Sequence, residues 1–321
     1  MDGEPLRADE LRDRLADPAW CEAPITDGES PLVLVDLDDP GMAAVDGPAP
    51  NWRVVAGIGA RDGAYPLCDV VVTDEHELAA VETTCTTAPL AAATLVQVLR
   101  AGAELGSVAG LVLESVAYSM LLAGPEFRRW YDRQPKRKAK AAVDPVLVEH
   151  DGDAWTVVLN RPDARNAYSA AMRDGLVDVL RAADAMDPPP SIVLRGNGPV
   201  FSSGGDLAEF GTTPDVVLAH GIRTVRAPGL LLQRLGATAR VHGLCVGAGV
   251  ELPAFCARVD AAPDTTFMLP EVAMGLIPGA GGTVSIARRV GRQRTALLAL
   301  TGSAIDAETA RTWGLVDAIS S

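Results

Sequence analysis

Several features are scarce in this sequence, and each absence excludes a class of protein. The five cysteines among the 321 residues are scattered, odd in number and form no CxxC pair, which argues against a disulfide scaffold. No His, Cys and Asp residues cluster at metal-ligand spacing, so no metal is expected. No apolar run reaches the ~20 residues of a membrane span, and the charged N-terminal stretch lacks the apolar region of a signal peptide. We therefore expect a cytoplasmic protein with reduced thiols.

Positive charge is also scarce. The chain has 28 Lys and Arg against 42 Asp and Glu, a formal net charge of −14. An acidic surface disfavours nonspecific binding to nucleic acid or to an anionic membrane, because both need positive charge. The one basic run is PKRKAKAA at residues 135–142. With 48% hydrophobic residues, the chain can bury the core of one large domain or two ordinary ones.

The stretch from 242 to 283 holds the residues most suggestive of chemistry. A glycine-rich turn at 247–249 leads directly towards Glu251. A second turn, at 278–282, follows Glu271, which lies 20 positions after Glu251. Backbone N–H groups at such turns are uncovered, and a following helix dipole favours negative charge there. Two carboxylates beside such turns are a plausible acid/base pair. On spacing alone, however, glycine turns more often only turn and glutamates more often face water.

The order of the motifs carries more information than the spacing. The sequence resembles the enoyl-CoA hydratase (crotonase) superfamily, and its hydratase branch in particular, over roughly residues 145–321. The resemblance rests on RPDARNAYS at 161–169, FSSGGDLAEF at 201–210, GAGVEL at 247–252, LPEVAMGLIPGAGGT at 269–283 and GLVDAI at 314–319.

The resemblance implies an α/β fold in which residues 143–321 form a crotonase-like spiral of ββα units. Upstream, compact apolar runs at 31–36, 52–59 and 68–73 predict strands of a small α/β segment over residues 1–84. Longer periodic runs at 89–104 and 107–123 predict helices within a helical segment, 85–142.

One departure from the family matters. In the family, several helices follow the GLVD segment, cover the active site and build a trimer, whereas this sequence stops at Ser321. Residues 89–140 read like those closing helices, which suggests that segment 85–142 takes their place; an unrelated N-terminal domain is the alternative. If the order is permuted, Lys136, Arg137, Lys138 and Lys140 are expected to reach the phosphates of CoA. A solvated linker is the other interpretation of this run.

The resemblance also assigns roles to individual residues. The backbone N–H groups of Gly205 and Ala248 are expected to form the oxyanion hole that stabilises a thioester enolate. Ala248 stands where the family usually has glycine. Glu251 is expected to orient and deprotonate the water that adds at the β-carbon, Glu271 to protonate the α-carbon, and the N–H of Gly279 to help hold the water.

Binding and assembly follow from the same resemblance. Arg165 and Asn166 are expected near the CoA entry, where Asn166 also organises a turn. The substrate is expected to be an acyl-CoA or an acyl carrier thioester, with no cofactor beyond the CoA moiety, and the protein a homo-oligomer, either a trimer or a dimer of trimers. Hydration of a 2-enoyl-CoA is the leading reaction. Isomerisation, decarboxylation or thioester hydrolysis, and a non-catalytic partner subunit, are the alternatives.

Overall fold

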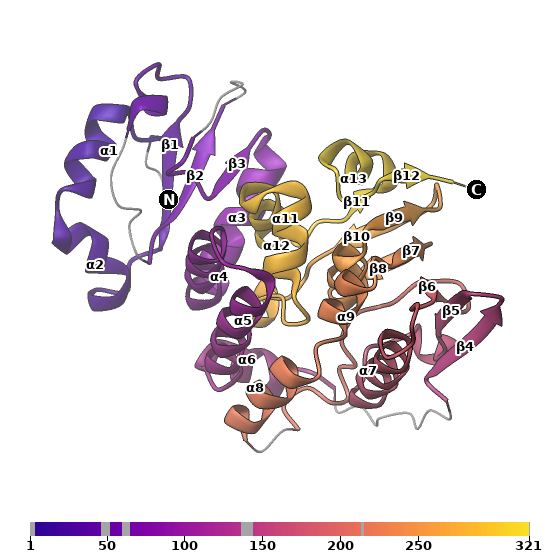
Figure 1. The fold of residues 1–321 in the computed structure, drawn as a ribbon. Coiled ribbons are helices and arrows are strands. Elements are labelled where there is room, and N and C mark those ends of the chain that lie inside the picture. Colours follow the sequence, from indigo (N-terminus) through magenta and orange to yellow (C-terminus); the bar gives the residue numbers. More distant parts are fainter. Residues whose placement is uncertain (1–3, 46–51, 60–64, 136–143, 213–214, 321) are drawn as a thin grey trace.

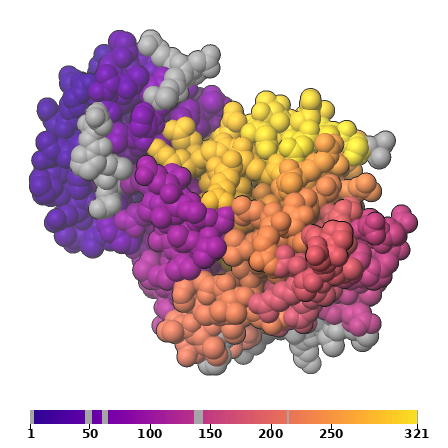
Figure 2. All heavy atoms as spheres, viewed as in Figure 1, coloured from indigo at the N-terminus to yellow at the C-terminus, as the bar shows by residue number. Residues whose placement is uncertain are grey.

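A computed structural model describes residues 4–45, 52–59, 65–135, 144–212 and 215–320. Three groups of elements follow one another along the chain: an N-terminal sheet with its helices, a central group of helices, and a larger sheet region that carries the C-terminal half (Figure 1). In the space-filling view the central helices lie between the indigo N-terminal part and the orange and yellow C-terminal part (Figure 2).

The N-terminal sheet is parallel and has the order β1 (Leu32–Asp36), β2 (Val54–Ile58) and β3 (Val70–Val72). Its residues are Val- and Leu-rich and largely buried, as expected of a parallel sheet covered on both faces. Helix α1 (Ala8–Leu15) packs on β1 and contacts α2 (Pro18–Thr26), and a separate small core forms there around Leu11 and Val35. The three predicted strands are confirmed, each with shorter bounds.

The central helices are α3 (Glu75–Thr87), α4 (Pro89–Gly102), α5 (Ser107–Leu122) and α6 (Pro125–Asp132). The alanine-rich α4 is buried along most of its length, because its small side chains allow close packing on both sides. Glu126 of α6 caps α4: the Leu90 and Ala91 amides donate to its two carboxylate oxygens at 2.9 and 3.0 Å. This cap fixes the position of α6 against α4. The two predicted helices, at 89–104 and 107–123, are confirmed.

The C-terminal half is built on a six-stranded sheet with the order β12-β9-β7-β6-β5-β4, parallel except for the β4–β5 hairpin. A smaller sheet has the order β11-β10-β8. The strands are β4 (Val146–Asp151), β5 (Ala154–Leu159), β6 (Ser191–Gly196), β7 (Thr238–Val241), β8 (Leu244–Val246), β9 (Arg258–Ala261), β10 (Thr266–Met268), β11 (Ile305–Asp306) and β12 (Ala318–Ile319).

Helices connect these strands. They are α7 (Ala170–Asp184), α8 (Val216–Val225), α9 (Pro228–Arg234), α10 (Ala248–Glu251), α11 (Gly282–Val290), α12 (Arg292–Thr301) and α13 (Ala307–Trp313). Helices α11 and α12 pack against α3, α4 and α5, so the central helices share the main hydrophobic core with the C-terminal half. Because of this shared core, the division at residues 84 and 142 stays a prediction about the sequence.

Two predicted elements are each broken in the structure. The helix expected within 214–235 is two helices, α8 and α9, because Pro228 has no N–H to continue the first and instead begins the second. The strand expected over 239–246 is also two, β7 and β8. Gly243 adopts φ +56°, and a Cβ there would lie 2.5 Å from the Pro199 carbonyl oxygen. This turn moves the chain from the six-stranded sheet to the smaller one.

Within the described ranges, no single helix is both long and apolar enough to cross a bilayer, although the sharply bent pair α5–α6 reaches that length and composition jointly. The same ranges contain no group of three or more His, Cys, Asp or Glu side chains arranged to hold a metal ion.

A buried aspartate joins the N-terminal sheet to the rest of the molecule. Asp69, 1% exposed, accepts hydrogen bonds from the Val55 amide at 2.9 Å and from Arg100 of α4 at 2.7 Å. Arg292 of α12 forms an ion pair with it at 3.3 Å. One carboxylate therefore links β2, α4 and α12.

We expect Asp69→Asn to lower the free energy of unfolding by about 3 kcal/mol, because it removes the negative charge that forms ion pairs with two partly buried guanidinium groups. Urea denaturation measures this. Asp13→Ala, at an exposed position of α1, is the control and should change stability by less than about 0.5 kcal/mol. An Asp69 variant as stable as the control would show that this link contributes nothing.

Candidate active site

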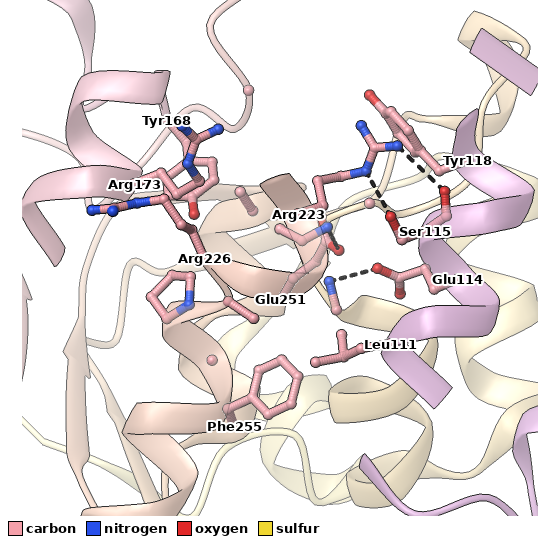
Figure 3. Close-up of a pocket in the computed structure, with 18 of the residues that line it drawn as sticks. Leu111, Glu114, Ser115, Tyr118, Tyr168, Arg173, Arg223, Arg226, Glu251 and Phe255 are labelled. Atoms are coloured by element: carbon pink, nitrogen blue, oxygen red, sulfur yellow. Dashed lines mark hydrogen bonds between the residues drawn. The ribbon is translucent and has the colours of Figure 1, made fainter. Parts of the chain in front are cut away.

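One pocket collects residues from both glycine-rich turns, from the loop after β6 and from α5 (Figure 3). The two glycine-rich turns and the residues beside them supply Ala248, Glu251, Glu271 and Gly279, and the loop after β6 supplies Gly205. All five had been predicted from the sequence. Helix α5 adds Leu111, Glu114, Ser115 and Tyr118, and α7, α8 and the segment after α8 add Arg173, Arg223 and Arg226. The pocket is thus closed on one side by a helix that lies more than 100 residues earlier in the chain.

The first glycine turn places an uncovered amide at the pocket wall. Gly247, at φ +49° and ψ −117°, precedes the single turn of α10, so Ala248 is the first helical residue and its N–H has no intrahelical acceptor. Gly205, in the loop that pairs with Tyr168, also lines the pocket. Neither amide has a hydrogen-bond acceptor among the residues that the structure describes. Both therefore remain available to a ligand oxygen.

The second glycine turn is held by two carboxylates. The amides of Ala280 and Gly282 donate to Oε2 of Glu251 at 2.7 and 2.8 Å. The amides of Gly281 and Thr283 donate to Glu114 at 2.7 and 2.9 Å, and the Thr283 hydroxyl adds a bond of 2.7 Å. Successive N–H groups thus point alternately to α10 and to α5. This alternation fixes the loop and the N-terminus of α11.

Burial shifts the titration of these acids. Desolvation raises the pKa of Glu251 to about 7, opposed by the amides of Ala280 and Gly282. Desolvation, and then the charge of Glu251, raise the pKa of Glu114 to about 8 against the donors from Thr283 and Gly281. The pKa of Glu271 is raised well above its usual range by desolvation and then by Glu251. Three acids so close together do not all ionise near neutral pH, so protonated and ionised carboxyl groups coexist.

Glu251 and Glu271 each keep one carboxylate oxygen without a protein partner. Oε2 of Glu271 is out of contact with solvent and has no hydrogen-bond partner among the described residues. Glu251 uses Oε2 for both loop amides, which leaves its Oε1 without a partner in the same described part of the chain. An unpartnered buried acid is costly, and such groups concentrate at functional sites.

Gly279, the residue predicted to position water, also lines the pocket. Its lack of a side chain is required, because a Cβ there would lie 2.4 Å from the Tyr118 ring. Tyr118 therefore packs directly over this backbone. The predicted role of the Gly279 N–H stays a prediction.

Two of the residues predicted to bind CoA, Arg165 and Asn166, do not line this pocket. Arg165 is exposed, in a left-handed turn at φ +51°, and does not line the pocket. Asn166 is fully buried: its amide donates to the carbonyls of Asn197, Val200 and Phe201, and its Oδ1 accepts from the Arg161 amide. It organises a turn, as expected, but these bonds leave its side chain no polar atom for CoA, which corrects that part of the prediction. Lys136 and Lys138, with Arg137 and Lys140, lie outside the described residues.

The sequence interpretation missed Glu114, Tyr118 and Arg223. A signal for the first was present: Glu114 is the only charged residue of the apolar helix α5, and it is 1% exposed. A buried charge in an apolar helix needs a partner, but the sequence could not say that the partner is a loop 167 residues away. Tyr118 and Arg223 carried no such signal.

The hypothesis that segment 85–142 takes the place of the family's closing helices requires α4 and α5 to lie beside Glu251. The structure meets this requirement, because α5 lines the pocket and both helices pack on α11. Equivalence with the closing helices of other proteins stays a prediction.

Known proteins resemble the C-terminal half. The family described as enoyl-CoA hydratase/isomerase matches residues 152–321. The 2,3-dehydroadipyl-CoA hydratase of Escherichia coli (strain K12) is 37% identical over 175 residues, which cover 54% of this chain and 68% of that protein. A mevalonyl-coenzyme A hydratase of Aspergillus fumigatus is 36% identical over 172 residues, covering 51% of this chain and 61% of that protein.

Solved structures agree. The enoyl-CoA hydratase of Thermoplasma volcanium superposes with a TM-score of 0.51 at 31% identity, over 56% of this chain and 72% of that one. An enoyl-CoA hydratase structure from Thermobifida fusca, solved in complex with CoA, superposes with a TM-score of 0.50 at 27% identity. The match covers 55% of this chain and 72% of that one. The α/β crotonase-like fold predicted for residues 143–321 is thereby confirmed.

The raised pKa of Glu251 predicts a pH-dependent stability. The folded protein holds a proton on Glu251 up to a higher pH than the unfolded chain does, because the pKa of Glu251 is raised on folding. The stability that comes from this bound proton is fully present below the ordinary pKa of a glutamate. It is lost as the pH rises through about 7, the pKa of Glu251 in the folded protein. Glu251→Gln keeps an oxygen that can accept from both loop amides but cannot ionise. We expect it to raise the free energy of unfolding at pH 8 by on the order of 2–3 kcal/mol, and to change it little at pH 5.

Urea denaturation at the two pH values measures this difference. Glu104→Gln, at an exposed position just after α4, is the control and should leave the pH dependence unchanged. Equal pH dependence in Glu251→Gln and wild type would mean that Glu251 ionises normally in the folded protein.

Proposed function

Because this chain belongs to the enoyl-CoA hydratase/isomerase family, we propose that it catalyses the reversible hydration of a 2-enoyl-CoA. The observation that carries the proposal is the pair of acids, Glu251 and Glu271, which line one pocket and each keep a carboxylate oxygen free of protein partners within the described residues. Relatives with hydratase names at 37% and 36% identity support the same reaction class.

Hydration adds the hydroxyl group of water to the β-carbon and a proton to the α-carbon of the enoyl thioester. Glu251, ionised, takes a proton from the water as its oxygen attacks the β-carbon. Glu271, protonated, donates its proton to the α-carbon. The raised pKa values suit these roles: one acid close to neutrality can act as the base, and the other can hold a proton at the same pH. The acid and base exchange roles in dehydration.

Negative charge develops on the thioester oxygen as the β-carbon is attacked. The amides of Gly205 and Ala248 are the donors we assign to that oxygen, since both line the pocket and neither is bound to another described residue. A backbone donor of this kind contributes about 10²–10³ in kcat. The Ala248 side chain does not remove the donor, so alanine in place of the family's usual glycine is compatible with the assignment.

The proposal also includes the carrier of the acyl group and the assembly of the protein. A free CoA thioester is the proposed substrate form, with a carrier-bound thioester as the alternative. The exposed turn at Arg165 remains a candidate for contact with the nucleotide end of CoA. A homo-oligomer, as a trimer or a dimer of trimers, and a cytoplasmic location stay predictions.

Loss of the enoyl absorbance of crotonyl-CoA and longer 2-enoyl-CoA esters tests the reaction directly. We expect hydration by the wild type and a fall in kcat of about 10²–10⁴ in both Glu251→Gln and Glu271→Gln. A large effect of Glu251→Gln alone would favour a one-acid reaction, such as isomerisation or decarboxylation. Absence of turnover with every chain length, in a folded protein, would favour a non-catalytic partner subunit.

Glu114 is a positioning residue in this proposal, because it acts through the loop at 280–283. Glu114→Gln removes one of the two oxygens that accept from the loop, and we expect kcat to fall about 10- to 100-fold with little change in KM. The charge of Glu114 also raises the pKa of Glu271. Without it, Glu271 should lose its proton at lower pH, so the alkaline limb of the kcat profile should move to lower pH. A purely structural role for Glu114 would lower activity without moving that limb.

A further inference from the structure

Arg223 is a cation in the pocket wall that the proposed reaction does not use. It lies on α8 and reaches across to α5, where its Nε donates to the Ser115 hydroxyl at 3.1 Å. Its Nη2 donates to the Ser115 carbonyl at 3.3 Å and to the Ser119 hydroxyl. The guanidinium carbon lies 4.7 Å from the centre of the Tyr118 ring. All of these contacts are with neutral groups.

No carboxylate among the described residues forms an ion pair with Arg223. The two other arginines of the pocket are paired: Arg173 with Asp174 at 3.0 Å, and Arg226 with Asp178 at 2.6 Å. Burial lowers the pKa of Arg223, but a guanidinium remains protonated at any physiological pH. A partly buried charge held only by hydroxyl groups, a carbonyl and an aromatic face is incompletely compensated.

The charge of Glu114 opposes the effect of burial on the pKa of Arg223, but none of the three buried glutamates forms an ion pair with Arg223 among the described residues. The Glu114 and Glu251 carboxylates accept hydrogen bonds from the loop at 280–283, and the Tyr118 ring lies close both to Gly279 and to the guanidinium. Figure 3 shows Arg223 with Tyr118 and Ser115 on one side of the pocket, and Tyr168 and Arg173 on the other. Arg223 lines the same pocket as Glu251 and Glu271, and its Nη1 has no acceptor in the described part of the chain.

We propose that Arg223 binds a carboxylate at the far end of the acyl chain, so that the preferred substrate is the 2-enoyl thioester of a dicarboxylic acid. This inference rests on the proposed function, because it places the acyl chain in the same pocket. The guanidinium donates to the substrate carboxylate through its free edge, while Ser115 and Ser119 hold it in place. Since the partners of Arg223 are neutral, the substrate carboxylate displaces no protein acid.

Two other roles make different predictions. If Arg223 bound a phosphate of CoA, its loss would weaken every CoA thioester equally. If it only joined α8 to α5, its loss would lower stability and affect all substrates by one factor. Only a carboxylate on the acyl chain makes the effect depend on the acyl group.

The test compares thioesters matched in chain length. For 2-enoyl-CoA esters of five to eight carbons, kcat/KM is measured with and without a terminal carboxylate, in wild type, Arg223→Met, Arg223→Lys and Arg234→Met. Arg234 is an exposed arginine on α9 that pairs with Asp184, outside the pocket, and serves as the matched control. We expect wild type and the control to prefer the carboxylate-bearing ester by about 10- to 100-fold at the best chain length.

Arg223→Met should lose that preference, because kcat/KM should fall further with the carboxylate-bearing esters than with the uncharged ones, and Arg223→Lys should retain part of it. Equal or better use of uncharged esters by the wild type at every length would overturn the proposal. So would an equal loss for both ester classes in Arg223→Met. Calorimetric binding of the saturated CoA esters, with and without the terminal carboxylate, separates the proposed hydration reaction from the proposed binding of a carboxylate by Arg223. If the wild type hydrates nothing but binds the carboxylate-bearing ester more tightly in an Arg223-dependent way, the proposed function fails and this one stands.

Discussion

The constraint on which the site depends is the division of the amides at 280–283 between Glu251 and Glu114. Glycine-rich backbone without side chains has many accessible conformations, and hydrogen bonds to charged acceptors are among the stronger ones available to hold it. Because the acceptors come from α10 and α5, the loop is held between the sheet region and the central helices. Gly279, Glu251 and the start of α11 can therefore keep their places only while α5 remains docked.

This arrangement has an electrostatic cost that the reaction can use. Each glutamate is buried, Glu251 raises the pKa of both Glu114 and Glu271, and Glu114 adds to the rise at Glu271, so the site stores protons near neutral pH. The amide donors limit the effect at Glu251 and bring its pKa back towards the pH at which a general base works. Glu271, which lacks such donors at its buried Oε2, is the acid left to hold a proton. Geometry and protonation thus derive from the same hydrogen bonds, and neither can be changed alone.

The apolar periodicity and the order of the motifs predicted those features that depend on residues close together in the sequence. The N-terminal strands, the helices α4 and α5, and the acids beside the glycine turns follow from apolar periodicity and from motif order, and the structure brings Glu251 and Glu271 into one pocket. What the pattern could not give depends on contacts between distant segments. Glu114 looked like part of an apolar helix, Asn166 like a ligand of CoA, and residues 239–246 like one strand, because their hydrogen-bond partners and the approach of Pro199 to Gly243 exist only in the folded chain.

The pocket contains both buried glutamates and the Arg223 guanidinium, so the placement of these groups relative to one another affects which glutamates ionise. An arginine paired directly with Glu271 would favour its ionised form and remove the proton that the proposed hydration requires. The Tyr118 ring lies close to Gly279 and to the Arg223 guanidinium, and its π face partly compensates the positive charge. Glycine at 279 permits this packing. Gly279 therefore lets the ring pack beside the loop that Glu251 and Glu114 hold, in a pocket that contains both buried carboxyl groups and an arginine without an ion pair among the described residues.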